Sequence, residues 1–112
     1  MANDCEGLCH ANLQRKHLEM FCYSPCDVTQ RLITLLQNNT GLKYLEVQGS
    51  SMREIPKVVC NLCQMEVLII SNNKIENLDS ECFQNMTALR ILDLASNNIQ
   101  EIPDYIFDNN QE

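Results

Sequence analysis

The sequence predicts an α/β solenoid, in which short parallel strands stack side by side and a cysteine-bearing cap closes the N-terminal end. Three segments, which start at residues 42, 65 and 89, align at offsets of 23 and 24 residues (65 − 42 and 89 − 65). A fixed period of this length is typical of proteins built from stacked units. Residues 1–39 do not fit the repeat and contain four of the seven cysteines. We therefore predict a cap over residues 1–39 and repeats over residues 40–112.

Length and charge narrow the possible functions. The 112 residues are enough for one modest core. The formal net charge of −7, with 8 Lys and Arg against 15 Asp and Glu, leaves no basic face for a phosphate backbone. The longest apolar runs, within residues 31–36 and 67–70, are far shorter than the roughly 20 residues of a membrane helix. We expect no nucleic-acid partner and no membrane contact by this segment.

The three segments share one pattern of apolar positions, L-x-x-L-x-L-x-x-N-x-L-x-x-L. In the L-x-L centre, alternate side chains of a short strand point to opposite faces, so one set of side chains is buried. The positions of the pattern are filled by Leu42, Leu45, Val47, Ser50, Met52 and Ile55; by Met65, Leu68, Ile70, Asn73, Ile75 and Leu78; and by Leu89, Leu92, Leu94, Asn97, Ile99 and Ile102.

The asparagine of the pattern follows each strand, where the chain must turn. A buried asparagine amide can bond to main-chain groups of its own turn and of the neighbouring turn, which offsets the cost of burying them. Asn73 and Asn97 are expected to form such a ladder. Ser50 has a shorter side chain with fewer donors. We therefore expect the first repeat to be the least regular.

Between the strands, the chain returns along the other side of the stack. Each unit buries its apolar face only by stacking on the next, and three units are near the minimum for stability. The sequence stops at residue 112, where another unit should begin. We expect an array truncated at its C-terminal end, whose open edge is available for self-association. The apolar residues of the return path are Val59, Leu62, Phe83, Met86 and Phe107.

This pattern resembles the leucine-rich repeat family over about residues 40–110. The resemblance implies a right-handed solenoid with parallel strands on its concave face and irregular or helical segments on its convex side. It also implies a non-catalytic protein-recognition module. The second repeat resembles the class found mainly in extracellular proteins, whereas the "IPKVVCNL" of the first resembles a cytosolic class.

The end of the predicted cap has the pattern of a short amphipathic helix. Asp27 is suited to the N-cap position, and apolar residues recur after it at helical spacing. This helix is expected to lie over the first coil. The apolar residues are Val28, Leu32, Leu35 and Leu36.

Four cysteines, Cys5, Cys9, Cys22 and Cys26, form two Cys-x3-Cys pairs in the predicted cap. The N-terminal flanks of extracellular leucine-rich-repeat proteins are similar, and this resemblance implies two disulfides, with Cys22 on a short edge strand. Those flanks have a further cysteine where this chain has Ala11. The four cysteines therefore allow three pairings, and the choice stays open.

Two alternatives concern the same cysteines. Their twin spacing resembles small mitochondrial intermembrane-space chaperones, in which the pairs lie on a helical hairpin. Pro25 opposes this, because it disfavours helical geometry at Ser24. A zinc site is the second alternative, although structural zinc sites usually space their ligands differently. We predict no metal and no cofactor.

Cys60 and Cys63 form a Cys-x-x-Cys motif on the return path. A redox motif needs a βαβ setting with a helix N-terminus that lowers the thiol pKa, which this segment does not offer. We expect both to be small buried core residues. A bridge from Cys82 to Cys60 or Cys63 is the alternative, and it leaves one thiol free.

The sequence indicates no catalytic site, because it has no nucleophile elbow and no glycine-rich phosphate loop, and only His10 and His17 as histidines. We therefore predict recognition of a protein ligand or co-receptor on the concave face. An apolar stripe with an acidic margin suits such a partner. The alternative is that β-branched residues are present only because they suit strands. The predicted ligand-binding residues are Tyr44, Glu46, Val67, Ile69, Ile91 and Asp93.

Two glycosylation sequons, at Asn38 and Asn85, favour the secretory route. We predict part of an extracellular or cell-surface receptor or adhesion glycoprotein. By resemblance, receptors of the Toll-like class, which act in innate immunity, are one group of proteins that contain such a segment. The alternative is a cytosolic scaffold or regulatory protein with reduced cysteines, and a third possibility is a zinc-stabilised cap.

Overall fold

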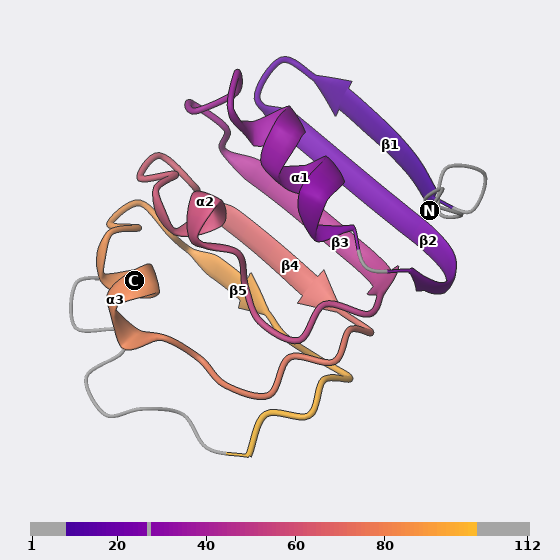
Figure 1. Cartoon of the computed structure of the whole chain (residues 1–112). Helices are drawn as coiled ribbons and strands as arrows, with labels where there is room; N and C mark the ends of the chain where they lie inside the picture. Colours follow the sequence, from indigo (N-terminus) through magenta and orange to yellow (C-terminus); the bar gives the residue numbers. More distant parts are fainter. Residues whose placement is uncertain (1–8, 27, 101–112) are drawn as a thin grey trace.

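The computed structural model describes residues 9–26 and 28–100, except for the side chains of residues 9 and 22–26. Five strands form one mixed sheet in the order β1-β2-β3-β4-β5 (Figure 1). The first two strands form an antiparallel hairpin, and the remaining strands continue parallel to β2. The strands are β1 (Cys9–Gln14), β2 (His17–Cys26), β3 (Tyr44–Ser50), β4 (Val67–Ser71) and β5 (Ile91–Asp93).

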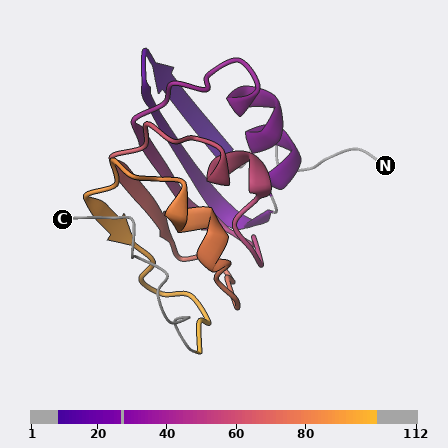
Figure 2. The ribbon, with the colours of Figure 1, turned by 90° about the vertical axis from the view of Figure 1, so that its left-hand side faces the viewer.

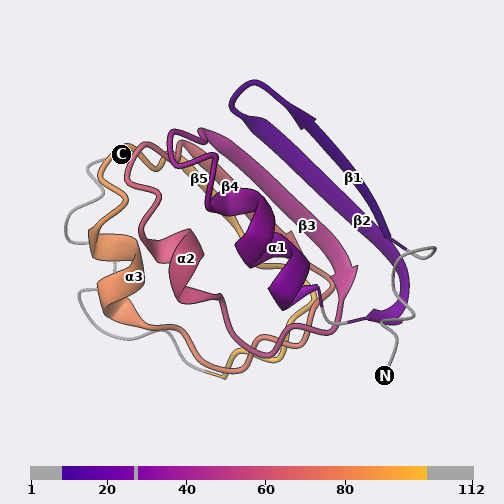
Figure 3. The same cartoon turned by 45° about the horizontal axis from the view of Figure 1, so that its top comes forward.

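Three short helices, α1 (Thr29–Leu36), α2 (Lys57–Cys60) and α3 (Ser80–Gln84), lie side by side on one face of this sheet (Figures 1 and 3). Figure 2 shows the sheet from its side: the helices lie on one face, and no helix of residues 9–26 and 28–100 lies on the other. We call these the covered face and the open face. An α/β architecture with parallel strands is therefore confirmed.

The strands pair in the register that the repeat predicts. Each predicted segment start, at residues 42, 65 and 89, lies two residues before the first residue of a strand. Tyr44 pairs with Val67, which pairs with Ile91, and the following positions pair in the same way. As a result, equivalent positions of successive segments form rows across the sheet.

The core lies between the sheet and the three helices, and it contains the predicted apolar positions. Alternate strand residues are fully buried, as the L-x-L centre predicts. The last strand is less well covered, since Leu92 and Leu94 are only partly buried. Phe107 and Ile102 lie outside the described residues. The buried side chains of the strands and of the return path include Leu45, Val47, Leu68, Ile70, Val59, Leu62, Phe83 and Met86.

The N-terminal hairpin joins this core directly. Leu18 and Met20 of β2 are fully buried, as are Leu32 and Leu36 of α1. The predicted amphipathic helix is thus present; it begins at Thr29 with Val28 at the N-cap position. Asp27, which we expected to cap it, lies outside the described residues.

The hairpin excludes one alternative and contradicts one expectation. Residues 9–26 form two strands, so the helical hairpin of the chaperone resemblance is absent from this segment. Cys22 lies on β2, a ten-residue strand between β1 and β3, and not on a short edge strand. The reason is that β1 folds back on β2 and takes the edge position itself.

The asparagine ladder is confirmed. Asn97 Nδ2 donates to the carbonyl oxygens of Ile70 (2.7 Å) and Leu94 (3.0 Å), and its Oδ1 accepts from the N–H of Ile75 (3.0 Å). Asn73 Nδ2 donates to the carbonyl oxygens of Val47 (3.1 Å) and Ser71 (2.9 Å). Each amide therefore ties its own turn to the turn of the preceding segment.

Ser50 holds the equivalent place with a different partner. Its Oγ accepts a hydrogen bond from the N–H of Val28 (3.2 Å), so it fastens the start of α1 to the end of β3. The less complete turn lies between the first and second segments, where the buried Oδ1 of Asn73 has no hydrogen-bond partner among the described residues. A missing bond to a buried polar atom costs stability at that junction.

One backbone feature recurs just before each ladder residue. Gly49, Asn72 and Ser96 have φ angles of 77°, 55° and 60°, and they are spaced by 23 and 24 residues (72 − 49 and 96 − 72). Glycine adopts this left-handed conformation without a steric penalty, and asparagine tolerates it better than most residues. The repeat pattern of apolar residues does not contain this position, although the turn depends on it.

Gly49→Ala is expected to lower the free energy of unfolding by about 1 kcal/mol. A Cβ at positive φ costs roughly 1–2 kcal/mol, and the reduced freedom of the unfolded chain offsets about half a kcal/mol of this. The control is Gly41→Ala, because a Cβ there meets Gln64 Oε1 at an ordinary 3.7 Å. Urea unfolding without reductant measures both, and an equal effect of the two substitutions contradicts the prediction.

Candidate functional site

The open face gathers all six residues that the sequence predicted as ligand-binding. Their side chains alternate with the buried ones along β3, β4 and β5, and pairing places them in two neighbouring rows. Strand β2 extends both rows, because His17 pairs with Tyr44 and Glu19 pairs with Glu46. The apolar row consists of His17, Tyr44, Val67 and Ile91, and the acidic row consists of Glu19, Glu46, Ile69 and Asp93.

His17 and Tyr44 form a stacked pair across the junction of the hairpin and the first repeated segment. Their ring centroids are 3.8 Å apart and the ring planes differ by 9°. The repeat pattern does not predict His17 and Glu19 as part of this face, because both residues lie within the predicted cap. A signal was present: "HLEMF" at residue 17 has the same alternation as "YLEVQ" at residue 44.

Neighbouring side chains hold the carboxylates of the acidic row in place. Tyr44 donates its hydroxyl to Glu46 Oε1 (2.7 Å), and Gln48 donates its amide to the other oxygen of Glu46. His17 Nε2 lies 2.8 Å from Glu19 Oε2. The bond to Glu46, followed by burial and the charges of Glu46 and Glu19, raises the pKa of Tyr44 from 10.0 to about 12. Tyr44 therefore remains a neutral hydrogen-bond donor at physiological pH.

Basic side chains lie at the start of the strands, beside the apolar row. Lys43 Nζ and a guanidinium nitrogen of Arg90 lie 3.8 Å and 3.7 Å from the two carboxylate oxygens of Glu66. Such exposed pairs contribute little to stability. An open groove of about 710 Å³ lies at this edge, between the β1–β2 turn and the residues around Tyr44. The open face is thus banded into a basic margin, the apolar row and the acidic row.

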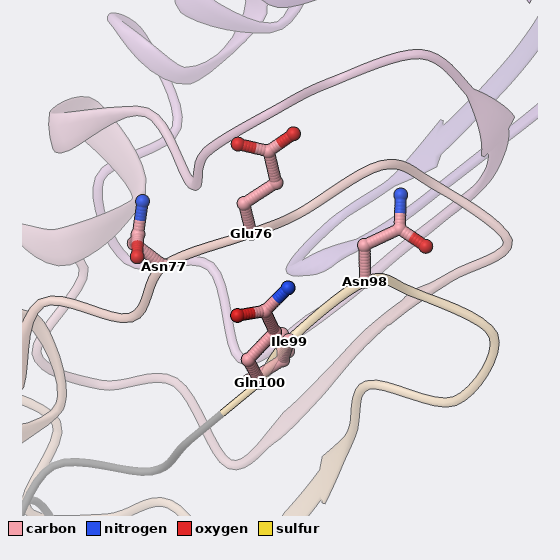
Figure 4. A pocket seen from close by; sticks show the side chains of 5 residues that line it. All are labelled: Glu76, Asn77, Asn98, Ile99 and Gln100. Atoms are coloured by element: carbon pink, nitrogen blue, oxygen red, sulfur yellow. The ribbon is translucent and has the colours of Figure 1, made fainter.

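A second hollow lies away from these rows. It measures about 660 Å³ and is formed by the loops that follow β4 and β5 (Figure 4). The described residues that line it offer one carboxylate, three amides and one aliphatic side chain, which supports hydrogen bonding but no acid–base pair. They are Glu76, Asn77, Asn98, Ile99 and Gln100.

The cysteines of the return path differ from the expectation. Cys60 of α2 and Cys82 of α3 form a disulfide, with 4.5 Å between their Cα atoms. Cys63 is exposed and is the free thiol among the described residues. The expectation that Cys60 and Cys63 are reduced core residues is therefore wrong, and the alternative bridge is present. The reason is that stacking brings α2 beside α3, which places Cys60 against Cys82.

The side chains of Cys5, Cys9, Cys22 and Cys26 lie outside the described part of the structure, so their disulfides stay predictions. The backbone register places Cys9 directly opposite Cys22 in the hairpin. Within the described residues, no group of three or more His, Cys, Asp and Glu side chains is placed to hold a metal ion. Residues 9–26 and 28–100 likewise contain no helix of the length and apolarity that a membrane span requires.

Both glycosylation sequons are accessible. Asn38 is exposed in the turn after α1, and Asn85 is exposed at the C-terminal end of α3. Because both helices lie on the covered face, a glycan at either position leaves the open face accessible. Whether either asparagine is glycosylated stays a prediction.

Comparison with known proteins supports the repeat. Residues 63–111 match the family described as leucine rich repeat, so the second and third segments carry the family's pattern. An adenylate cyclase of Podospora anserina is 31% identical over 63 residues, which are 56% of this chain and 3% of that protein. No solved structure matches the chain. A leucine-rich-repeat segment suggests a protein-interaction module, and the chain spans only a small part of the curated relative's length.

The phenol of Tyr44 is expected to titrate near pH 12. Subtracting the 295 nm titration of Tyr44→Phe from that of the wild type isolates this group. Glu46→Gln should move its midpoint down towards 10, because the phenol loses its hydrogen bond to a carboxylate and the negative charge beside it is removed. Since the folded pKa lies above the unfolded value, the linked stability is complete below pH 10 and is lost as the pH rises through 12. A midpoint unchanged by Glu46→Gln contradicts this account.

Proposed function

We propose that this chain is a non-catalytic protein-recognition module, and that it binds a protein ligand or co-receptor on its open face. The observation that carries this proposal is the surface formed by the apolar and acidic rows. Ile91 is 47% exposed, and the other apolar residues of these rows are only partly buried. Apolar side chains that are exposed in a contiguous row beside polar groups are typical of interaction sites.

In this proposal, the chain is the N-terminal part of a right-handed leucine-rich-repeat solenoid, and its open face is the concave one. Residues 1–39 serve as the cap, because strand β2 extends the sheet and α1 covers the first coil. Solenoids need such terminal units to cover the apolar edge. At the other end, β5 has three residues and its core side is only partly buried, which supports self-association or further repeats there.

We further propose an extracellular or cell-surface location. The disulfide between Cys60 and Cys82 supports it, since disulfides persist in oxidising compartments and are rare in the cytosol. The exposure of Asn38 and Asn85 is compatible with glycosylation. A receptor ectodomain of the Toll-like class is one form that such a protein takes.

The alternative is a cytosolic scaffold or regulatory segment with reduced cysteines. The similarity of a short stretch to an adenylate cyclase keeps this alternative open, because a recognition segment can lie within a much longer enzyme. A third form is a zinc module built from Cys5, Cys9, Cys22 and Cys26. These forms differ in the number of free thiols and in bound zinc, so a measurement of both distinguishes them.

Thiol counting by mass spectrometry under non-reducing, denaturing conditions tests the location. The proposal expects one free thiol, at Cys63, because Cys60 is bonded to Cys82 and the proposal pairs the four cysteines of the cap with one another. Seven free thiols without metal contradict the extracellular form and support the cytosolic one. Stoichiometric zinc released on thiol blocking supports the zinc module instead.

Ile69→Asp tests the recognition role. Ile69 lies in the acidic row between Glu46 and Asp93, so an added carboxylate removes the apolar contact without disturbing the buried side of β4. Peptides selected from a phage-displayed random library on the wild-type protein should lose binding to this variant. The matched control is Asn98→Asp, an exposed position outside both rows. Circular dichroism checks the fold, and unchanged binding to Ile69→Asp contradicts the proposal.

A further inference from the structure

The open face carries carboxylates that no lysine or arginine of the described residues neutralises; Glu19 has the His17 imidazole beside it, with Nε2 at 2.8 Å from Oε2. In the acidic row, three of the four positions are carboxylates, and in the apolar row no position is a lysine or arginine. All eight Lys and Arg residues of the chain are among the described residues. None of them forms a salt bridge to a carboxylate of the acidic row within the described structure.

The hydrogen bonds inside the acidic row leave it able to accept more. Glu46 receives one bond on each oxygen, from Tyr44 and Gln48, and Asp93 Oδ1 accepts from the N–H of Ala95 (3.0 Å). An ionised carboxylate offers about four acceptor positions, so each still accepts further donors. The donors that hold Glu46 and Asp93 are neutral. The groups are thus oriented but not compensated in charge.

The cations nearest to the acidic row form no salt bridge with it in the described structure, although Arg15 and Lys16 line the open groove together with Glu19. Lys43 and Arg90 lie at the start of the strands and both approach Glu66, on the far side of the apolar row from the carboxylates. The surface therefore presents an acidic row and an adjoining exposed apolar row on the same strands. A partner that matches both must carry a cation next to apolar side chains.

Resting on the proposed recognition role, we propose that the partner of the open face is a protein segment that presents arginine or lysine beside aliphatic side chains. The cation lies on the carboxylates of Glu19 and Glu46, and the aliphatic groups cover Val67, Ile69 and Ile91. The binding face thereby includes strand β2 of the hairpin. Charge complementarity of this kind selects partners and speeds their association, and arginine in particular bonds carboxylates through two parallel N–H groups.

A second copy of this chain is a poor occupant of the same face. The chain has a formal net charge of −7, and two open faces would oppose one acidic row to another. Like charges brought together across an interface are unfavourable and suppress that pairing. The partner is therefore a different, basic protein segment.

The experiment selects peptides from a phage-displayed random library on the whole protein and measures their affinities. The test variant is Glu19→Gln with Glu46→Gln, and the control is Glu54→Gln with Glu81→Gln, which removes the same charge at exposed positions outside both rows. The peptides that lose binding to Ile69→Asp should be rich in Arg or Lys next to aliphatic residues. Their affinity should fall about tenfold in the test variant, stay within about twofold in the control, and weaken as salt is raised.

Glu46→Gln alone provides a second variant in case the double substitution perturbs the hairpin, because Glu46 lies on β3, and the same peptides should bind it more weakly than the wild type. The salt dependence of peptide affinity is measured on the wild type, so it does not rely on any substitution. Peptides that lose binding to Ile69→Asp but show no basic enrichment, and no loss in the test variant, overturn this inference while the recognition role stands. Peptides that bind Ile69→Asp unchanged overturn both.

Discussion

In-register parallel pairing of β2, β3, β4 and β5 is the constraint on which the rest of the structure depends. A single strand with one helix or turn behind it cannot bury its apolar side alone, so each segment is stabilised by the one beside it. Because β3, β4 and β5 pair in register with one another, and with β2 from His17 to Phe21, equivalent positions form rows across the sheet. The buried rows make the core, and the outward rows make the open face.

The turns after the strands keep that register. Asn73 and Asn97 bond to carbonyl oxygens of the preceding segment, so a shift of one residue between strands would leave these buried groups unpaired. Gly49, Asn72 and Ser96 supply the left-handed backbone that brings each ladder residue into place. The ladder ends at Ser50, whose hydroxyl oxygen accepts from the N–H of Val28 in the N-terminal segment.

The open face follows from the same geometry and reaches beyond the repeats. Strand β2 is not part of the repeated sequence, yet parallel pairing with β3 places His17 and Glu19 in the rows of Tyr44 and Glu46. The hairpin therefore has two roles in the fold: its inner side completes the core, and its outer side enlarges the open face. Disulfide bonding on the opposite side, between Cys60 and Cys82, ties neighbouring return segments where the hydrogen-bond ladder does not reach.

The sequence by itself determined the position of each repeated strand, the buried positions, the asparagine ladder and the six central residues of the open face. These features recur at a fixed period, and a periodic pattern states which side of a strand is buried. Only the tertiary structure decided that residues 9–26 form a hairpin, that His17 stacks on Tyr44, and that Cys82 pairs with Cys60 while Cys63 stays free. Those contacts join segments distant in the chain and outside the period, so they depend on how the strands and helices stack and not on any local preference.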